Sequence, residues 1–253
     1  MIFREDLFAN KTILVTGASS GIGREFCILA SKLGAKLRLL GRDKARLASV
    51  EKKLAGSGHI TFVDDISGVD NFRALLIRIA KEGGPFNGLF HAAGLNQFDS
   101  LKRGSDANIH KNFDASFGGS VAILAACARK DVMPQHSSIV LMSSVAGHSG
   151  QKGMSLYCAS KSAIDGLVRG AAVELADRGI TVNSIVSGAV DTEMHRMALS
   201  WMNEAAIKEY EKKHLLGFGD PEDIAHSAVY LLSPAGKWIT GTNMVVDGGL
   251  LAQ

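Results

Sequence analysis

Short β-branched segments alternate with longer amphipathic segments along most of this 253-residue chain. Alternation of this kind is typical of βαβ units with right-handed crossovers. It predicts an α/β fold in which a Rossmann-type, doubly wound parallel sheet forms the middle of a three-layer αβα arrangement. Strands are predicted at Thr12–Thr16, Lys36–Leu40, Ile60–Asp64, Gly88–His91, Ser138–Met142, Ile180–Ile185 and Met244–Asp247. Helices are predicted from Ile22, at Lys44–Ala55, Val69–Glu82, Ile109–Asp131 and Tyr157–Arg178, and from Pro221 behind the N-cap Asp220.

The whole chain is expected to form one domain. No Pro/Ser-rich linker, charge block, low-complexity tract or internal repeat divides it. A hydrophobic content of 46% is enough for the large core of a sheet that is covered on both faces. We therefore assign residues 1–253 to a single domain.

Charge and cysteine usage argue against several classes of protein. The formal net charge is only +3 and the basic residues are scattered, which does not favour nucleic-acid binding. The N-terminus lacks the apolar core of a signal peptide, and the longest apolar run, 121–128, is too short for a membrane span. Cys27, Cys127 and Cys158 have no metal-ligand or disulfide spacing, so we expect no metal and a cytoplasmic location.

A glycine-rich turn, Gly17-Ala18-Ser19-Ser20-Gly21-Ile22-Gly23, follows the first predicted strand and opens the first predicted helix. A turn in this position presents free backbone N–H groups and the positive end of the helix dipole, which suits a pyrophosphate. Gly17 allows the tight turn, while Gly21 and Gly23 leave room for backbone and phosphate to approach. The alternative is an ordinary glycine-rich loop, and the flanking strand and helix make dinucleotide binding the better interpretation.

Tyr157 and Lys161 are four residues apart in a predicted helix, and Ser144 lies thirteen residues upstream of Tyr157. Positions i and i+4 share a helix face, so the ammonium of Lys161 can approach the phenol of Tyr157. A nearby cation lowers the pKa of a phenol, and a serine hydroxyl within reach can hold a substrate oxygen against it. The alternative is a buried tyrosine beside an unrelated surface lysine.

Together these segments resemble the short-chain dehydrogenase/reductase family over nearly the whole chain, and the 3-oxoacyl-acyl-carrier-protein reductases in particular. The matching motifs are Thr16–Gly23, His91-Ala92-Ala93-Gly94, Ser143–Gly147, Tyr157–Lys161, Val182-Asn183, Gly188 with Asp191-Thr192, Ile239-Thr240-Gly241 and Val246–Gly249.

The resemblance implies hydride transfer between a nicotinamide cofactor and a small-molecule carbonyl or alcohol, with 3-oxoacyl thioesters as candidate substrates. It gives Tyr157 the role of general acid and Ser144 that of oxyanion stabiliser. Lys161 is expected to lower the pKa of the phenol and to hold the nicotinamide ribose. The domain is then a catalytic, dinucleotide-binding one.

The resemblance also implies a set of cofactor-binding residues. They are Gly17, Ser19, Ser20, Gly21, Ile22, Gly23, Arg42, Asp65, Ile66, His91, Ala92, Ala93, Gly94, Tyr157, Lys161, Gly188, Val190 and Thr192. NAD-binding folds place a carboxylate at the end of the second strand, where this chain has Gly41 followed by Arg42. Because a guanidinium binds a 2′-phosphate well, we expect NADP(H) to be preferred, while the adjacent Asp43 leaves NAD(H) possible.

The chain departs from the family pattern at three positions. His91 replaces the first Asn of Asn-Asn-Ala-Gly, Ser187 replaces a proline before Gly188, and Ser116 occupies the position of an asparagine that supports a proton-relay water. A serine can still bind such a water, so Ser116 is kept as a catalytic candidate. Replacing it with asparagine either strengthens the relay or overpacks the helix.

Residues 190–218 interrupt the alternation and are rich in methionine and leucine, with one tryptophan. We expect a substrate lid here, since long insertions of this sort often cover active sites. The alternative is an ordinary helical pair packed on the core.

Other functions stay open at this stage. One is NAD-dependent oxidation of a sugar, steroid or polyol alcohol, and another is a catalytically weak, dinucleotide-binding regulatory protein. We also expect a homo-oligomer, a dimer or tetramer, formed through helices Ile109–Asp131 and Tyr157–Arg178. The small residues expected to allow close helix approach are Gly118, Gly119, Ala122, Ala125 and Ala126.

Overall fold

The computed structural model describes residues 2–66, 68–94 and 101–253. These residues form one seven-stranded sheet in the order β3-β2-β1-β4-β5-β6-β7, with every neighbouring pair parallel. The strands are β1 (Thr12–Thr16), β2 (Lys36–Gly41), β3 (Ile60–Val63), β4 (Gly88–His91), β5 (Ser138–Ser144), β6 (Thr181–Ser187) and β7 (Asn243–Val246). The order runs outward in both directions from β1, so the predicted doubly wound α/β fold is confirmed.

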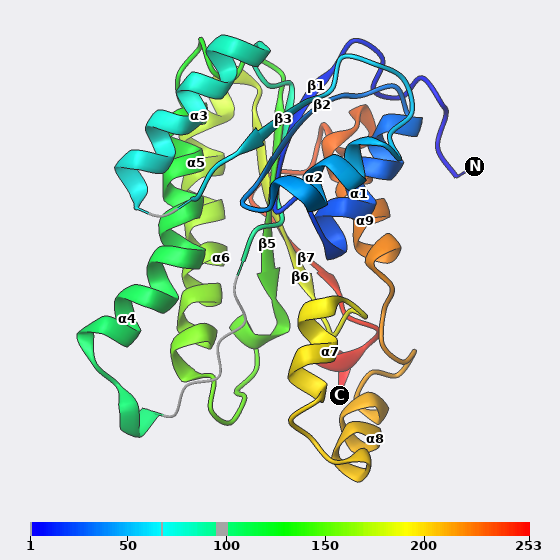
Figure 1. Ribbon diagram of the computed structural model, residues 1–253. Coiled ribbons are helices and arrows are strands. Elements are labelled where there is room, and N and C mark those ends of the chain that lie inside the picture. The colour runs from blue at the N-terminus through cyan, green and yellow to red at the C-terminus, as the bar shows by residue number, and fades with distance from the viewer. Residues whose placement is uncertain (1, 67, 95–100) are drawn as a thin grey trace.

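Helices cover both faces of the sheet (Figure 1). The α-helices are α1 (Gly21–Lys32), α2 (Lys44–Glu51), α3 (Val69–Gly83), α4 (Asp106–Phe113), α5 (Gly119–Cys127), α6 (Ser155–Leu175), α7 (Glu193–Leu199), α8 (Glu204–Lys212) and α9 (Pro221–Leu232). One face carries α3, α5 and α6, and the other carries α1, α2 and α9. Short 3-10 turns lie at Leu101–Arg103, Val145–Gly147, Ala176–Arg178, Pro234–Gly236 and Leu250–Ala252.

The core has two halves because successive strand residues point to opposite faces of the sheet. In β1, Leu14 packs with the α3, α5 and α6 side, whereas Ile13 and Val15 pack with the α1 and α9 side. All three are at most 1% exposed. A strand that is buried on both faces has no polar side, which explains the continuous apolar run in the sequence.

Local sequence sets several element ends. Helix α9 begins at Pro221 behind the N-cap Asp220, as the sequence predicts, and Asp223 completes a capping box with Asp220. Asp43 caps α2 by accepting a hydrogen bond from the backbone N–H of Arg46 at 3.0 Å. Strands β5 and β6 each extend two residues beyond the predicted ends, because residues 142–144 pair with 185–187.

The predicted helix Ile109–Asp131 is confirmed as a helical segment, but it is not one regular α-helix and it ends earlier than predicted. The structure has α4, then a π-helical turn at Asp114–Gly118, then α5, which ends at Cys127. A π turn widens the helix by one residue per turn and often marks a functional site. Here it is followed by Gly119, which packs against the His91 ring: a Cβ built on this glycine would lie 3.4 Å from the His91 Nε2.

The parallel strands bring the predicted site to one edge. Gly17, Gly94, Ser144 and Gly188 follow or end β1, β4, β5 and β6 at their carboxyl ends, where ligands bind in such sheets. Helices α7 and α8 lie beyond this edge (Figure 1). Among the described residues, none of the helices combines the length and apolar character that a membrane span requires.

Candidate active site

Tyr157, Lys161 and Ser144 meet at the carboxyl end of β5. Tyr157 and Lys161 lie on successive turns at the start of α6, and the Lys161 Nζ is 5.6 Å from the centroid of the phenol ring. The Ser144 and Tyr157 hydroxyl groups are hydrogen-bonded to each other. Lys161 Nζ donates a hydrogen bond to the Met142 carbonyl at 2.9 Å. The structure therefore brings the three residues together as the sequence predicts.

Ser144 is held in place because it joins the end of β5 to the 3-10 turn that follows. It ends β5 and caps the 3-10 turn Val145–Gly147, with its Oγ accepting a hydrogen bond from the Ala146 N–H at 3.2 Å. The hydroxyl oxygen therefore already has a backbone donor in Ala146, and Tyr157 is its side-chain partner. A third contact, to a substrate oxygen, is within the hydrogen-bonding capacity of a serine.

The electrostatics of the pair differ from the expectation that Lys161 lowers the phenol pKa. Burial raises the pKa of Tyr157 to about 12, and the hydrogen bond from Ser144 only partly opposes this. Burial also lowers the pKa of Lys161 to about 8, and the nearby Asp165 carboxylate opposes that shift. Desolvation of the phenol by burial is therefore the dominant effect, and it raises the pKa of Tyr157 in spite of the nearby ammonium.

The sequence argument missed Asp165. This carboxylate is 4% exposed, accepts a hydrogen bond from the Ser184 Oγ at 3.0 Å, and lies 2.9 Å from the His148 Nε2. It continues the spacing of Tyr157 and Lys161 by four more residues on α6. That i+4 repeat on one helix face is the signal that identifies it.

The glycine-rich turn forms a cradle that is packed tightly against neighbouring segments and leaves no room for larger residues. A Cβ on Gly17 would lie 2.8 Å from the backbone nitrogen of Ala93, and one on Gly21 would lie 3.2 Å from Thr192 Cγ2. A Cβ on Gly23 would collide with the carbonyl oxygen of Gly17. Since this turn also begins α1, its free N–H groups and open backbone fit a dinucleotide pyrophosphate.

The other predicted cofactor residues surround this cradle. Ser19, Ser20 and Ile22 belong to the turn or to the start of α1. Gly94 lies 4.0 Å from the Lys161 Nζ, measured from a Cβ built on it, which joins the β4 end to the Tyr157 pair. Gly188 packs against the backbone of Asp247, and Val190 is buried. Thr192 caps α7, with its Oγ1 accepting a hydrogen bond from the His195 N–H at 3.2 Å.

Arg42, Asp65 and Ile66 lie toward the β2 and β3 side of the same edge. Arg42 is exposed directly after β2. Asp65 accepts a hydrogen bond from the Ile66 N–H at 2.8 Å and lines an open hollow of about 400 Å³ with Asn71, Leu75 and Arg78, among others. These residues are separate from the Tyr157 pair, as the two ends of a dinucleotide require.

His91 serves a structural role at the first Asn position of the family motif. Its Nδ1 is 2.6 Å from the Thr16 Oγ1, which also accepts a hydrogen bond from the Ala93 N–H at 3.3 Å. Burial, with a contribution from the Lys161 charge, lowers the pKa of His91 to about 3, so the ring is neutral. The histidine therefore ties the ends of β1 and β4 together, leaving Ala92 and Ala93 beside the glycine turn.

Comparisons with known proteins agree with this arrangement. A family model described as enoyl-(acyl carrier protein) reductase matches residues 17–251. A short-chain dehydrogenase/reductase from Brucella melitensis, described as SDR:glucose/ribitol dehydrogenase, superposes with a TM-score of 0.88 at 27% identity, covering 98% of this chain and 99% of its own. This chain belongs to the short-chain dehydrogenase/reductase family.

Its relatives in the short-chain dehydrogenase/reductase family carry several activities in their names. The 3-oxoacyl-acyl-carrier-protein reductase FabG of Rickettsia conorii is 30% identical over 241 residues, which is 95% of this chain and 97% of the relative. An L-xylulose reductase of Caenorhabditis elegans is 31% identical over 244 residues, with 96% of each chain covered. Carbonyl reductase family member 4 of Danio rerio is 31% identical over 241 residues, covering 95% of this chain and 98% of the relative. This protein is accordingly an oxidoreductase of a family that uses NAD(P)(H).

Residues 190–218 place an aromatic cluster beside the site. His195, Tyr210, His214 and Phe218 contact one another, with ring centroids 4.7 Å apart for His195 and Phe218. The electrostatic interaction with Tyr210 contributes a small part of the raised pKa of Tyr157, which places α8 near the candidate general acid. Sequence reasoning did not single out Tyr210, because no local motif marks it.

Ser116, the candidate relay residue of this short-chain dehydrogenase/reductase, lies within the π-helical turn and is 3% exposed. Its carbonyl accepts a hydrogen bond from the Ser120 Oγ at 3.0 Å. Because the position is enclosed, we expect Ser116→Asn to overpack the turn, lowering stability by about 1–3 kcal/mol and reducing kcat. The measurement is kcat across pH together with thermal unfolding. A higher kcat at unchanged stability would instead support a relay that serine holds loosely.

Proposed function

We propose that this protein reduces a carbonyl group to an alcohol with NADPH, and that 3-oxoacyl thioesters are its substrate class. The observation that carries the proposal is the joint position of Ser144, Tyr157 and Lys161 beside the glycine cradle, at the carboxyl edge of the sheet. A bound nicotinamide cofactor supplies the hydride. The chain's own residues position the carbonyl, stabilise its oxygen and deliver the proton.

Tyr157 acts as general acid. With a pKa near 12, its phenol is protonated throughout the neutral range and can donate to the carbonyl oxygen as negative charge develops there. Ser144 is already hydrogen-bonded to the phenol and can donate to the same oxygen. Lys161 lies behind the phenol, where its ammonium stabilises the phenolate that remains after proton transfer.

The protonation state of Tyr157 suits carbonyl reduction. With its pKa raised to about 12 by burial, the phenol is in the neutral form that donates a proton in reduction, whereas alcohol oxidation uses the phenolate as general base. The joint presence of Ser144, Tyr157 and Lys161 argues against the alternative of a catalytically weak regulatory protein.

NADP(H) is the proposed cofactor. Gly41 offers no carboxylate at the end of β2, and the nearby Asp43 is committed to capping α2. Arg42 is exposed beside them and is the proposed ligand of the 2′-phosphate. Asp65, which lines the hollow near α3, and the neighbouring Ile66 would take the adenine, and Thr192 would take the nicotinamide amide.

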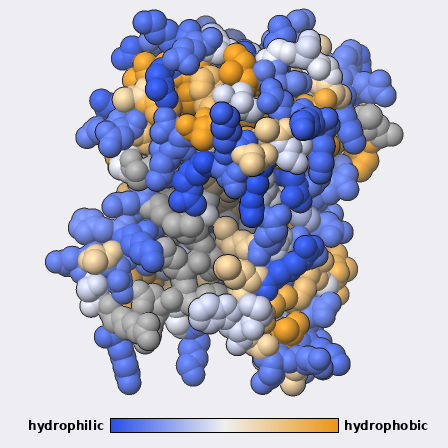
Figure 2. All heavy atoms as spheres, viewed as in Figure 1, coloured by the Kyte–Doolittle hydropathy of each residue, from blue (hydrophilic) through white to orange (hydrophobic). Residues whose placement is uncertain are grey.

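Residues 190–218 are proposed as the substrate lid. No residue of α7 or α8 is fully buried, which distinguishes them from helices packed on the core. Apolar side chains gather over this region at the lower right of Figure 2, and Met197, Trp201 and Leu216 are 70%, 86% and 87% exposed. An extended acyl chain suits such a surface, since methionine adapts to varied apolar shapes. The names of the 3-oxoacyl reductases among the relatives support the same substrate class.

A panel assay tests the proposed activity. Purified protein is mixed with NADPH or NADH and with 3-oxoacyl thioesters of several chain lengths, pentuloses, aliphatic ketones and 2-enoyl thioesters. We expect the highest kcat/KM with NADPH and a 3-oxoacyl thioester. A higher kcat/KM for the pentuloses would replace the substrate class, and activity confined to the enoyl thioesters would replace the reaction.

The pH dependence of reduction is expected to follow Lys161 and not Tyr157. Below its pKa of about 8, Lys161 carries the charge that stabilises the developing phenolate. As the pH rises through that value, the ammonium loses its proton and kcat/KM should fall, although Tyr157 stays protonated up to about 12. The measurement is kcat/KM for reduction across this range. A rate that stays constant well above pH 8 would contradict the role of the Lys161 charge.

In the proposed homo-oligomer, we expect α6 to contribute more of the contact between subunits than α5 does. Gly118, Gly119, Ala122 and Ala126 are buried within the subunit, so the idea that they line the contact is wrong for these four, and only Ala125 is exposed. Helix α6 exposes Val173 at 78%, together with Ala159 and Gly170. We expect a dimer or tetramer in analytical ultracentrifugation, and a monomer at micromolar concentration would contradict this.

A further inference from the structure

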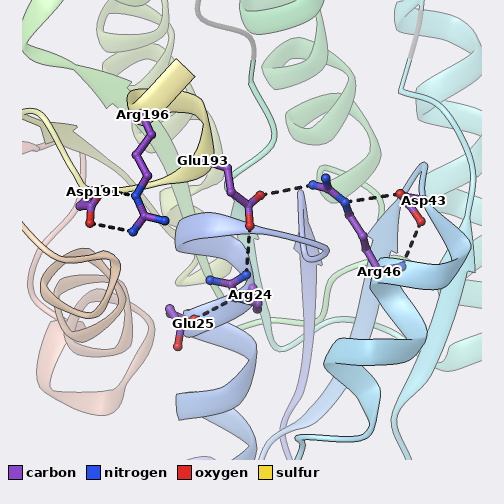
Figure 3. Close-up of polar contacts among 7 residues, drawn as sticks. All are labelled: Arg24, Glu25, Asp43, Arg46, Asp191, Glu193 and Arg196. Atoms are coloured by element: carbon purple, nitrogen blue, oxygen red, sulfur yellow. Dashed lines mark hydrogen bonds and ion pairs between the residues drawn. The ribbon is translucent and has the colours of Figure 1, made fainter. Parts of the chain in front are cut away.

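Three charged side chains from separate elements meet across the glycine-rich turn (Figure 3). The Glu193 carboxylate, at the start of α7, lies 3.3 Å from the Arg24 Nη1 of α1 and 3.2 Å from the Arg46 Nη1 of α2. Each of its two oxygens faces one guanidinium. Two arginines that are 22 residues apart in sequence thus converge on a single anion supplied from the lid.

The position of the Glu193 carboxylate matters more than the strength of its ion pairs. Thr192, the preceding residue, packs against Gly21, so Glu193 begins α7 next to the glycine-rich turn. Arg46 follows Arg42 by four residues and Gly41 by five, which places its backbone beside the end of β2. That end of β2 is where a dinucleotide fold holds the adenosine ribose and any 2′-phosphate.

The ion pair between Glu193 and Arg46 is weak enough for another anion to replace Glu193. Arg46 and Glu193 have side chains that are 58% and 50% exposed, and exposed ion pairs contribute little net stability. Arg24 keeps a second partner in Glu25 at 2.9 Å, and Arg46 keeps the more distant Asp43 at 3.5 Å. A phosphate offers a guanidinium more charge and better bidentate geometry than a monodentate carboxylate oxygen does.

We propose that Arg46 is a ligand of the 2′-phosphate of NADP(H), and that Glu193 is a built-in competitor that occupies Arg46 until the phosphate arrives. The inference rests on the proposed preference for NADP(H) and adds to it a specificity-determining pair. Arg46 exchanges the Glu193 carboxylate for the phosphate, and Arg24 retains Glu193. NAD(H) has no 2′-phosphate and leaves the Glu193–Arg46 contact in place, so the pair acts on one cofactor only.

The test is calorimetric titration of the purified protein with NADP⁺, NAD⁺ and 2′,5′-ADP, which isolates the phosphate-bearing half of the cofactor. Arg46→Gln should weaken NADP⁺ and 2′,5′-ADP about tenfold, the loss expected for one charge-assisted contact, and leave NAD⁺ unchanged. Glu193→Gln should strengthen NADP⁺ and 2′,5′-ADP roughly threefold by removing the competitor, again with NAD⁺ unchanged. In the double variant, the gain from Glu193→Gln should vanish, because Arg46 is no longer there to be released.

A matched control is Arg196→Gln, which removes an arginine from the same helix as Glu193. Arg196 pairs with Asp191 at 2.7 Å and contacts neither α1 nor α2 through an ion pair among the described residues. It should leave all three affinities unchanged. Circular dichroism and thermal melts of every variant verify that the fold is kept.

The outcomes separate this inference from the proposed function. If Arg42→Ala removes the NADP⁺ preference while Arg46→Gln does not affect 2′,5′-ADP, the inference fails and the proposed cofactor stands. Equal effects of Glu193→Gln on NADP⁺ and NAD⁺ would mean that Glu193 only holds α7 in place, which also overturns the competition. Equal wild-type affinities for NADP⁺ and NAD⁺ would contradict the proposed cofactor preference itself.

Discussion

Tyr157→Phe is expected to lower the rate of carbonyl reduction by roughly 10²–10⁴-fold, the contribution typical of a general acid. The phenyl ring keeps the packing of the partly buried tyrosine and loses only the hydroxyl that is hydrogen-bonded to Ser144. Cofactor affinity and thermal stability should change little. The measurements are kcat/KM for the best substrate of the panel, NADPH affinity by titration, and a thermal melt.

Ser144→Ala provides the companion variant. It removes the hydrogen bond to Tyr157 and one donor to the substrate oxygen, while the backbone of β5 stays paired with β6 through residue 144. We expect a loss of about 10²–10³-fold in kcat, as for a single oxyanion-stabilising donor.

Substantial turnover by Tyr157→Phe at intact cofactor affinity would remove Tyr157 from the role of essential acid.

Gly23→Ala is expected to abolish NADP⁺ binding and to destabilise the fold by about 1–3 kcal/mol through overpacking. The added Cβ would meet the carbonyl oxygen and carbon of Gly17, so backbone, not a flexible side chain, must move. That movement would distort the turn whose N–H groups hold the pyrophosphate. Titration with NADP⁺ and chemical denaturation measure the two effects separately.

Gly150→Ala is the matched control for this glycine. An added Cβ at Gly150 meets no atom within 4 Å, and its backbone φ lies outside the positive range that favours glycine. Affinity and stability should both stay at the wild-type value. Unchanged NADP⁺ affinity in Gly23→Ala would show that close backbone approach at this turn does not form the cofactor site.

Much of this architecture is predictable because it depends on local patterns. Each strand is a short apolar run, and the apolar residues of each helix recur at the helical period. The element order and the parallel sheet therefore follow from the sequence. The glycine turn and the Tyr157–Lys161 spacing are also local, and the fold brings both to one edge of the sheet. The resemblance to a known family adds the roles of these residues.

The differences arise where packing between distant segments decides the outcome. The π turn at Asp114–Gly118 precedes Gly119, which packs against His91, 28 residues away, and helical periodicity does not predict such a turn. The raised pKa of Tyr157 depends on burial, which outweighs the nearby lysine on which the sequence argument relied. The ion pairs of Glu193 connect it to residues 169 and 147 positions away, beyond the reach of any motif.

The central claim is that hydride reaches a carbonyl carbon while Tyr157 protonates its oxygen, and an isotope label tests it most directly. The protein is incubated with a 3-oxoacyl thioester and NADPH that carries deuterium at the transferable position, and the product is examined by mass spectrometry and NMR. We predict one deuterium on the carbinol carbon of a 3-hydroxyacyl thioester, formed by the wild type and nearly absent with Tyr157→Phe. Deuterium on a carbon of a reduced C=C bond, or equal labelling by the two forms, would contradict the account.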